Sequence, residues 1–206
     1  MSQKVKNLGI VMDSSMTFNY HIDEIHRKVY GTLIYLNRIW ERFQQESRVM
    51  VVRSLVLSIL NYCLCVWGST SKTQMSRLQK LQNFAARVTI GGIRKHEHVT
   101  PLYDKLGWLR MDEKFLFDIC LLVYKIKHRV LPEWLFSLPT VNQRRNEAIN
   151  TRNQDYYFVR RTFTDIGTRA ITVLGPRSWN VLPASMKQCP NMSNFKSLLS
   201  NHLKTK

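Results

Sequence analysis

The spacing of apolar residues predicts a mainly helical chain. Residues 4–12 (KVKNLGIVM) are expected to form a short β-strand and are followed by the polar residues 13–15. Beyond them, apolar residues recur every three or four positions, which predicts one long amphipathic helix capped by Thr17 or Ser15. Its apolar stripe consists of Phe18, Ile22, Ile25, Val29, Leu33, Leu36, Trp40 and Phe43.

Three further helices are expected. Residues 47–67 are apolar on nearly every side, so this helix should lie at the centre of a bundle, and its internal Arg, Ser and Asn residues argue against a membrane span. The helix over 71–90 should end at Gly91-Gly92 and bury Met75, Leu78, Leu81, Ala85 and Val88. The next spans 112–128, with Asp112 as its N-cap and with Phe115, Ile119, Leu122 and Ile126 facing inward.

The composition changes at Pro139. Residues 139–155 are polar and are expected to form a linker. Beyond it, 156–163 (YYFVRRTF) and 169–174 (RAITVL) are rich in strand-forming residues, and 194–203 is apolar at helical spacing. The expected organisation is therefore a strand in 1–16, a helical bundle in 17–138, a linker in 139–155 and a small basic α+β region in 156–206.

Charge distinguishes this chain more than any motif does. It carries 31 Lys and Arg against 14 Asp and Glu, a net charge of +17, and segments 51–100 and 151–206 carry +6 and +7 of it. Such an excess favours a polyanionic partner, either nucleic acid or an anionic membrane surface. Four cysteines are too sparse for a secreted disulfide scaffold, and no signal peptide begins the chain, so an intracellular location is expected.

Two groups of basic residues are candidate phosphate contacts. Those of the helix over 71–90 and its end are Lys72, Arg77, Lys80, Arg87, Arg94 and Lys95. An ordinary solvated helix face is the alternative. The second group lies among Tyr156, Tyr157, Phe158 and Phe163, a mixture that suits backbone contact with base stacking, and consists of Arg160, Arg161, Arg169 and Arg177. Its alternative is a strand with aromatic side chains inward and Arg outward.

Catalytic motifs are absent from the sequence. It contains no glycine-rich phosphate loop, G-x-S-x-G or H-E-x-x-H, and Cys63-x-Cys65 lacks the spacing of a zinc pair. Its acidic pairs fit a solvated helix face at Asp23-Glu24 and a helix N-terminus at Asp112-Glu113. We therefore expect no catalytic residue, metal ion or cofactor. A nuclease site assembled from Asp155, Asp165 and His202 ranks last.

Several strings, in order along nearly the whole chain, resemble the C-terminal part of reverse transcriptases of non-LTR retrotransposons, especially jockey-like elements. They are LGIVMDSSMTFNYHI (8–22), SLVLSILNYCLCVWG (54–68), LQKLQNFAARVTIGG (78–92), LYDKLGWLRMDEK (102–114) and LGPRSWNVLPASMKQCPNMSNFKSLLSNHL (174–203). The resemblance implies that residues near Leu8, Gly9 and Ile10 correspond to the primer-grip hairpin at the end of the palm. It also implies that the helices from Phe18 to about Ile90 correspond to the thumb, which holds the template–primer duplex.

The same resemblance implies an incomplete polymerase. The palm carboxylates that hold two Mg²⁺ ions for phosphoryl transfer have no counterpart here, so the chain alone should not polymerise DNA. The expected function is sequence-nonspecific binding of an RNA–DNA hybrid or duplex DNA by an intracellular, nuclear remnant, with an upstream polymerase palm as a further partner and no membrane. The alternatives are a helical protein-interaction module and an inert relic of a decayed element.

Overall fold

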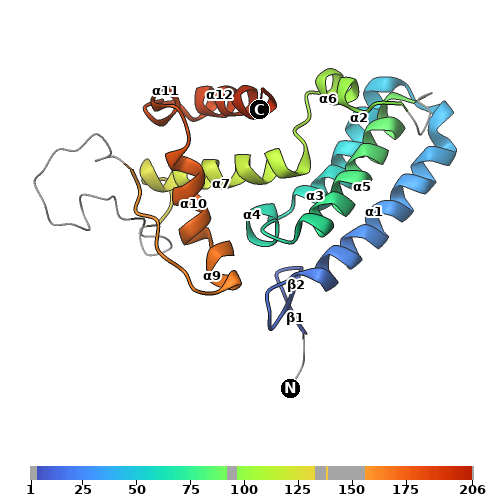
Figure 1. Cartoon of the computed structure of the whole chain (residues 1–206). Coiled ribbons are helices and arrows are strands. Elements are labelled where there is room, and N and C mark those ends of the chain that lie inside the picture. Colours follow the sequence, from blue (N-terminus) through green and yellow to red (C-terminus); the bar gives the residue numbers. More distant parts are fainter. Residues whose placement is uncertain (1–3, 92–96, 133–137, 139–155, 206) are drawn as a thin grey trace, which may run out of the picture. The chain divides into compact units, whose positions relative to one another are not determined.

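The computed structural model describes residues 4–91, 97–132, 138 and 156–205 (Figure 1). The chain divides into two compact units, Met1–Lys114 and Phe115–Lys206, which are described separately below. The fold is mainly helical with short β-structure at its N-terminal end, as the sequence predicts, and this β-structure is a two-stranded sheet. The predicted linker 139–155 and the candidate residues Arg94 and Lys95 lie outside the described residues.

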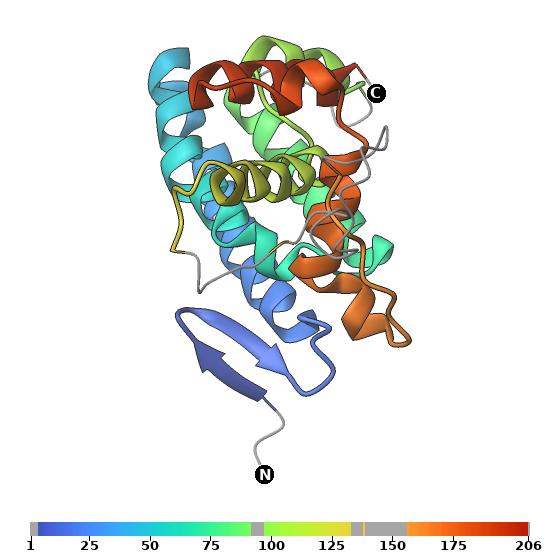
Figure 2. The same ribbon diagram turned by 90° about the vertical axis from the view of Figure 1, so that its left-hand side faces the viewer.

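The first unit begins with a β-hairpin at the start of the first helix (Figure 2). Strands β1 (Lys4–Asn7) and β2 (Ile10–Asp13) are antiparallel. The single strand predicted over 4–12 is therefore wrong. Leu8 and Gly9 form a two-residue turn with φ of 45° and 82°, the conformation that such hairpins require. Leu8 is an unusual residue at this position, so residue preferences alone did not indicate the turn, although the family resemblance implied a hairpin near Leu8, Gly9 and Ile10.

Helix α1 (Asn19–Ile39) continues into the short 3₁₀ helix η1 (Trp40–Arg42). Of the predicted stripe, all residues from Phe18 to Trp40 are buried, and only Phe43 is partly exposed, at 37%. The predicted caps are wrong. Phe18 occupies the N-cap position and makes no side-chain cap, while the carboxylate of Asp13 fixes the turn before the helix by accepting from the backbone N–H groups of Ser15, Thr17 and Phe18.

The apolar stretch that follows α1 is broken rather than continuous. Helix α2 (Gln45–Val52), the π-helical turn η2 (Arg53–Leu57) and α3 (Ser58–Asn61) run on from one another. Tyr62 is extended and Cys63 is left-handed, and α4 (Leu64–Trp67) follows this corner.

Only one side of this stretch is covered. By length and composition alone Gln45–Trp67 could cross a membrane, and 28% of its most apolar window is buried. Met50 and Leu55 are 70% and 50% exposed, so the prediction of a central, fully enclosed helix is wrong. The covered side contains Val52, Val56, Leu57, Leu60, Leu64 and Trp67.

Helix α5 (Lys72–Ile90) completes the bundle of the first unit and packs against α1 and α2. Ser71 caps it by accepting from the N–H of Gln74, and Gly91 ends it with a φ of 77°. Of its predicted stripe, Leu78, Leu81, Ala85 and Val88 are buried and Met75 is half-buried. The short helix α6 (Thr100–Leu106) packs against α5.

The second unit contains most of α7 (Met111–Lys127) together with α9 (Asp165–Arg169), α10 (Ile171–Asn180), α11 (Ala184–Lys187) and α12 (Met192–Lys204). The buried side of α7 differs from the predicted one. Of the four predicted inward residues only Ile119 is fully buried. The core of this unit centres on the stacked rings of Tyr124 and Phe195, whose centroids are 4.4 Å apart.

The β-structure predicted beyond residue 155 is wrong for the residues that the structure describes. Residues 171–174 belong to α10, and 156–163 form no strand. Val173, Pro176 and Trp179 recur every three residues and are all buried, so packing of one helical face outweighs the strand preference of Ile171 and Val173.

Candidate nucleic-acid interface

Helices α1 and α5 run side by side in the same direction. At their beginnings, the amide of Gln74 donates to that of Asn19 at 2.8 Å, and one turn later Arg77 pairs with Asp23 at 2.9 Å. Contacts between the two helices continue toward their C-terminal ends, at Tyr30–Phe84. Because the pairs advance together along both helices, their outer faces lie side by side.

Beyond the Arg77–Asp23 pair a pocket of about 670 Å³ lies between the outer faces of the two helices. We call it the α1–α5 groove. None of the described residues that line it is acidic. Its polar and aromatic lining consists of His26, Tyr30, Asn37 and Trp40 from α1 and η1, and Lys80, Asn83, Phe84 and Arg87 from α5, with Gly91 at the end.

The α5 side of the groove presents hydrogen-bond donors. Lys80, Asn83 and Arg87 are spaced at three and four residues, so they follow one face of the helix. Asn83 is held by its Oδ1 atom, which accepts from the amide of Gln79 and from the hydroxyl of Tyr103, each at 2.8 Å. Among the described residues its NH₂ group therefore remains for a ligand.

The orientation of the Asn83 amide is fixed by hydrogen bonds through Gln79 and Tyr103. The backbone N–H of Met111 donates to Oε1 of Gln79, so the NH₂ end of Gln79 must point to Tyr103 and Asn83. Burial raises the pKa of the Tyr103 hydroxyl, which keeps it a donor at neutral pH. These contacts turn the NH₂ group of Asn83 away from its partners Gln79 and Tyr103.

Two buried N–H groups lie at the C-terminal end of the groove. Nε of Arg87 and the indole N–H of Trp40 have no hydrogen-bond partner in the described part of the chain. Arg48 stacks over the Trp40 ring at 4.4 Å, and one Nη of Arg87 donates to the carbonyl of Glu97 at 3.0 Å. Cations and orphaned donors thus gather at this end, which favours an acceptor or an anion there.

The α1 side of the groove is aromatic. His26 and Tyr30, one helical turn apart, stack with centroids 5.8 Å apart and an angle of 19° between their rings. Tyr30 also contacts the ring of Phe84 across the groove, at 6.1 Å between centroids. A flat ring system beside a row of donors suits a base next to its phosphate.

Only some of the basic residues predicted on the helix over 71–90 line the groove. Lys80 and Arg87 line the α1–α5 groove, whereas Lys72 is exposed in the first turn of α5. Arg77 is half-buried, and its charge is offset by Asp23. Asp23 lies on an exposed face of α1, as the sequence predicts, and its pairing with Arg77, 54 residues away, is an addition that the sequence did not indicate.

The C-terminal candidates lie in the second unit. Arg160, Arg161 and Arg177 are exposed, and Arg169 donates to the carbonyl of Asp165 at 3.3 Å. Of the aromatic residues among them, Tyr157 is buried against Trp179, so it belongs to the core rather than to a stacking surface. Phe163, in contrast, is 98% exposed.

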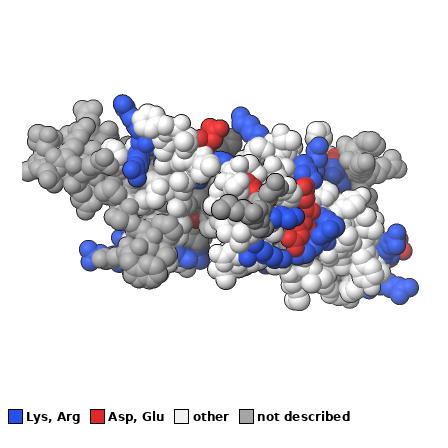
Figure 3. Space-filling model, turned by 90° about the horizontal axis from the view of Figure 1, so that it is seen from below, with Lys and Arg blue, Asp and Glu red and all other residues white. Residues whose placement is uncertain are grey.

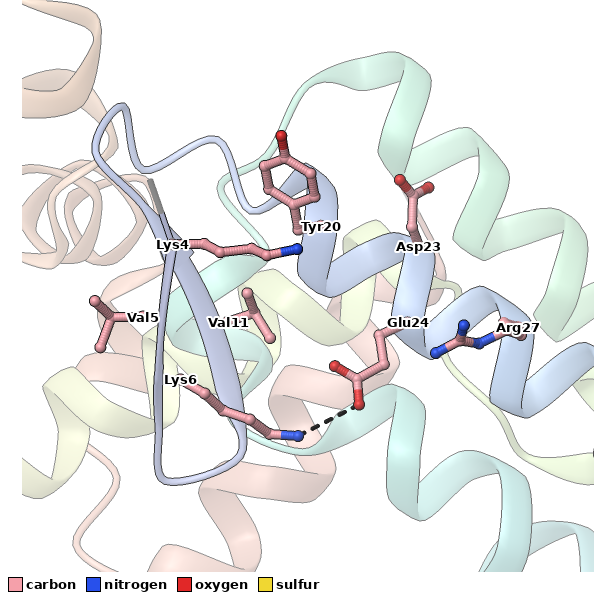
Figure 4. A pocket seen from close by; sticks show the side chains of 8 residues that line it. All are labelled: Lys4, Val5, Lys6, Val11, Tyr20, Asp23, Glu24 and Arg27. Atoms are coloured by element: carbon pink, nitrogen blue, oxygen red, sulfur yellow. Dashed lines mark hydrogen bonds and ion pairs between the residues drawn. The ribbon is translucent and has the colours of Figure 1, made fainter. Parts of the chain in front are cut away.

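The hairpin forms a different kind of pocket with α1, of about 590 Å³ (Figure 4). Glu24 pairs with Lys6 at 3.4 Å and with Lys28 at 2.8 Å, while Lys4 lies 4.8 Å from the ring of Tyr20. A view of this side shows basic and acidic atoms next to one another (Figure 3). Its charges are largely matched internally, so it is a weaker anion site than the α1–α5 groove.

The predicted primer-grip residues lie at the tip of the hairpin. Leu8 and Gly9 form the turn and line a pocket of about 410 Å³ with Tyr62, while Ile10 is buried. The Tyr62 hydroxyl donates to the carbonyl of Leu8 at 3.0 Å, which ties the hairpin to the corner before α4. This hydrogen bond supports the hairpin mechanically.

The described residues give little support for a metal site or for thiol chemistry. No three His, Cys, Asp or Glu side chains of that part gather as metal ligands would, and no disulfide joins cysteines there. Cys63 and Cys65 are half-buried, and Cys120 and Cys189 are buried. Of the proposed nuclease residues, Asp165 lies in the first turn of α9, His202 lies on α12, and Asp155 is outside the described residues.

Comparison with known proteins identifies no relative: no protein-family model, curated protein or solved structure matches this chain.

Sequence reasoning missed the groove residues that carry no charge. His26 and Tyr30 lie on the outer face of the first predicted helix, four residues apart, and their spacing was a usable signal. Asn83 lies between the predicted residues Lys80 and Arg87 on the same helical face. Trp40 was predicted to be core only, and its orphaned N–H is visible only in three dimensions.

Proposed function

We propose that the chain binds nucleic-acid duplexes, RNA–DNA hybrids or duplex DNA, without sequence specificity through the outer face of α1 and α5. The observation that carries this proposal is the α1–α5 groove, in which Lys80 and Arg87 lie beside aromatic rings and no described lining residue is acidic. Basic side chains contact phosphates, and such contacts fix position without reading sequence.

The proposed origin of this activity is the thumb of a non-LTR retrotransposon reverse transcriptase. The ordered strings of the sequence support that origin, and the up-down-up arrangement of α1, α2–α3 and α5 is compatible with a duplex-holding module. In this proposal the chain is not an enzyme by itself, because it lacks the palm carboxylates that would hold Mg²⁺. An upstream palm would be its partner, and the nucleus its location.

Binding of a fluorescent RNA–DNA hybrid as a function of salt tests the proposal. We expect micromolar or tighter affinity at low salt and a steep decline between about 50 and about 200 mM salt, with duplexes preferred over single strands. Absence of binding by the folded protein at low salt would contradict the proposal despite its charge of +17.

Charge reversal then locates the surface. Lys80→Glu should weaken duplex binding and lower the salt slope by about 0.9 for each phosphate that is no longer neutralised. Lys105→Glu, at an exposed position of α6 outside the groove, makes the same change in net charge and serves as the control. Equal effects of the two substitutions would mean that total charge, not this face, governs binding.

A protein-interaction module is the second candidate function. Its support is the uncovered side of Gln45–Trp67, where Met50, Leu55, Tyr62 and Val66 are all exposed by 47% or more. Exposed apolar patches mark contact surfaces when they are large and contiguous. Self-association that disappears in Met50→Lys, with duplex binding unchanged, would favour this function.

A further inference from the structure

The α1–α5 groove has features that nonspecific duplex binding does not require. A surface that only follows a duplex backbone needs exposed cations, whereas this groove is a pocket of about 670 Å³ with an aromatic wall. That volume lies within the range of small-molecule sites, which is about 300–1,000 Å³. The pocket is therefore large enough for one nucleotide.

One side of the pocket is complementary to a phosphate group. The ammonium group of Lys80, the NH₂ of Asn83 and the guanidinium of Arg87 succeed one another along one face of α5. Nε of Arg87 and the indole N–H of Trp40, itself only 8% exposed, are buried without a partner among the described residues. Several donors with no acceptor are the arrangement that an oxyanion completes.

The other side of the pocket is complementary to a base. Tyr30 stacks on His26, and the ring of Phe84 contacts the ring of Tyr30 across the groove. Because every base has a π-face, such rings bind nucleobases without selecting among them. Phe84 follows Asn83 directly in the chain, so ring and phosphate donor come from adjacent positions.

The geometry points to a pocket for a single nucleotide that carries a phosphomonoester, with the phosphate on Lys80, Asn83 and Arg87 and the base against Tyr30. This inference rests on the proposed function and makes it more specific. A monoester carries more negative charge than a backbone diester, which suits two cations in a groove whose described lining contains no carboxylate. The ligand is then a free nucleotide or the phosphorylated end of a strand.

Titration of the full chain separates these sources. Calorimetry compares AMP with adenosine, and anisotropy compares single-stranded oligonucleotides that end in a 5′-phosphate, a 3′-phosphate or hydroxyl groups only. We expect AMP to bind at least about tenfold more tightly than adenosine. If the ligand is the end of a strand, the oligonucleotide phosphorylated at one of its two ends should bind more tightly than the other two oligonucleotides by a similar factor. Equal affinity for AMP and adenosine, together with equal affinity for all three strands, would overturn the inference.

Asn83→Asp tests the phosphate side. The variant keeps an oxygen for Gln79 and Tyr103 but replaces the donor with a charged acceptor, so AMP binding should fall at least about tenfold. Asn201→Asp, exposed on α12, changes the net charge equally and should leave AMP binding intact. Lys80→Gln, an exposed position, gives the same test where the first variant fails to fold. Unchanged AMP binding in folded Asn83→Asp or Lys80→Gln would overturn the assignment.

Tyr30→Ala tests the base side. Weaker AMP binding in this variant, with recovery in Tyr30→Phe, would support stacking, and Tyr35→Ala on the same helix is the control because Tyr35 is exposed outside the groove. Duplex binding is measured in parallel on every variant. Retained duplex binding without phosphate preference would overturn this inference alone, whereas AMP binding without duplex binding would overturn the proposed function.

Discussion

The guanidinium of Arg77 on α5 lies 2.9 Å from the carboxylate of Asp23 on α1, at the end of the α1–α5 groove where the charges are balanced. Arg77 also donates to the side chain of Gln74 at 2.8 Å. The pair is therefore a boundary: on one side of it the basic residues have a carboxylate partner, and on the other side Lys80 and Arg87 line a groove without a described acidic residue.

Removing the carboxylate should extend the binding surface. In Asp23→Asn, Arg77 keeps its hydrogen bond to Gln74 but is no longer neutralised, so we expect tighter duplex binding at low salt and a salt slope steeper by up to about 0.9. The cost in stability should be at most about 1 kcal/mol, because both side chains are substantially exposed. Anisotropy titrations over a salt series measure the slope.

Asp104→Asn is the matched control for this variant. Asp104 is exposed on α6, away from the groove, and its substitution changes the net charge by the same amount. If both variants bind more tightly by the same factor, the effect comes from net charge and the boundary role of Asp23 is wrong.

The carboxylate of Asp13 should contribute strongly to the stability of the first unit. Burial by itself would raise its pKa, but hydrogen bonds from Thr17, Phe18 and Ser15 outweigh that effect and lower the pKa. Asp13→Asn should cost about 1–2 kcal/mol at neutral pH, because several N–H donors of the turn before α1 lose a charged acceptor. Denaturant unfolding followed by circular dichroism measures the difference.

The pH dependence of that difference has a definite sign. Because the pKa of Asp13 is lowered on folding, its stabilisation is full above the unfolded value of about 3.9 and is lost as the pH falls through the lower folded value. The gap between the parent chain and Asp13→Asn should therefore shrink at strongly acidic pH. A gap that is constant with pH would show that the carboxylate charge is irrelevant to these hydrogen bonds.

Leu8→Asn should stabilise the hairpin. Leu8 is 82% exposed, so its side chain contributes little packing, while its φ of 45° is unfavourable for leucine and favourable for asparagine before glycine. We expect the unfolding free energy to rise by about 1 kcal/mol. Leu8→Ala, which shares the unfavourable backbone conformation, should show no comparable rise, and equal stabilisation by both variants would contradict the explanation.

Features that depend only on residues within one helix could be predicted from sequence. The stripe from Phe18 to Trp40 depends only on helical spacing, and the same spacing placed Lys80 and Arg87 on one face of α5. The end of α5 at Gly91 was also predictable, because glycine tolerates the φ of 77° observed there.

Features that depend on distant or atypical partners could not be predicted in this way. Asp23 meets Arg77 across 54 residues, and Asn83 is oriented by Tyr103, which belongs to another helix. The turn at Leu8 lacks the usual residues of its type, and Val173 follows the packing of α10 rather than its own strand preference. In each case the tertiary environment decides, and single-sequence patterns do not record it.

His21 should make the first unit less stable in mildly acidic solution. The side chain is 5% exposed and packs edge-on against Trp67, and Val11 N–H donates to its Nδ1 at 3.5 Å. Burial lowers its pKa, Glu24 opposes this effect, and Lys28 and Lys6 add to it.

The folded chain therefore favours neutral His21, and the unfolded chain binds the proton more readily. Stability should be full above the unfolded value of about 6.5 and should fall as the pH drops from there toward the lower folded pKa. His21→Gln, which keeps a neutral acceptor for Val11, should flatten this dependence, whereas His98→Gln at an exposed position should not. Unfolding curves at a series of pH values between about 7.5 and about 5 measure it, and an unchanged pH dependence in His21→Gln would assign the destabilisation to another group.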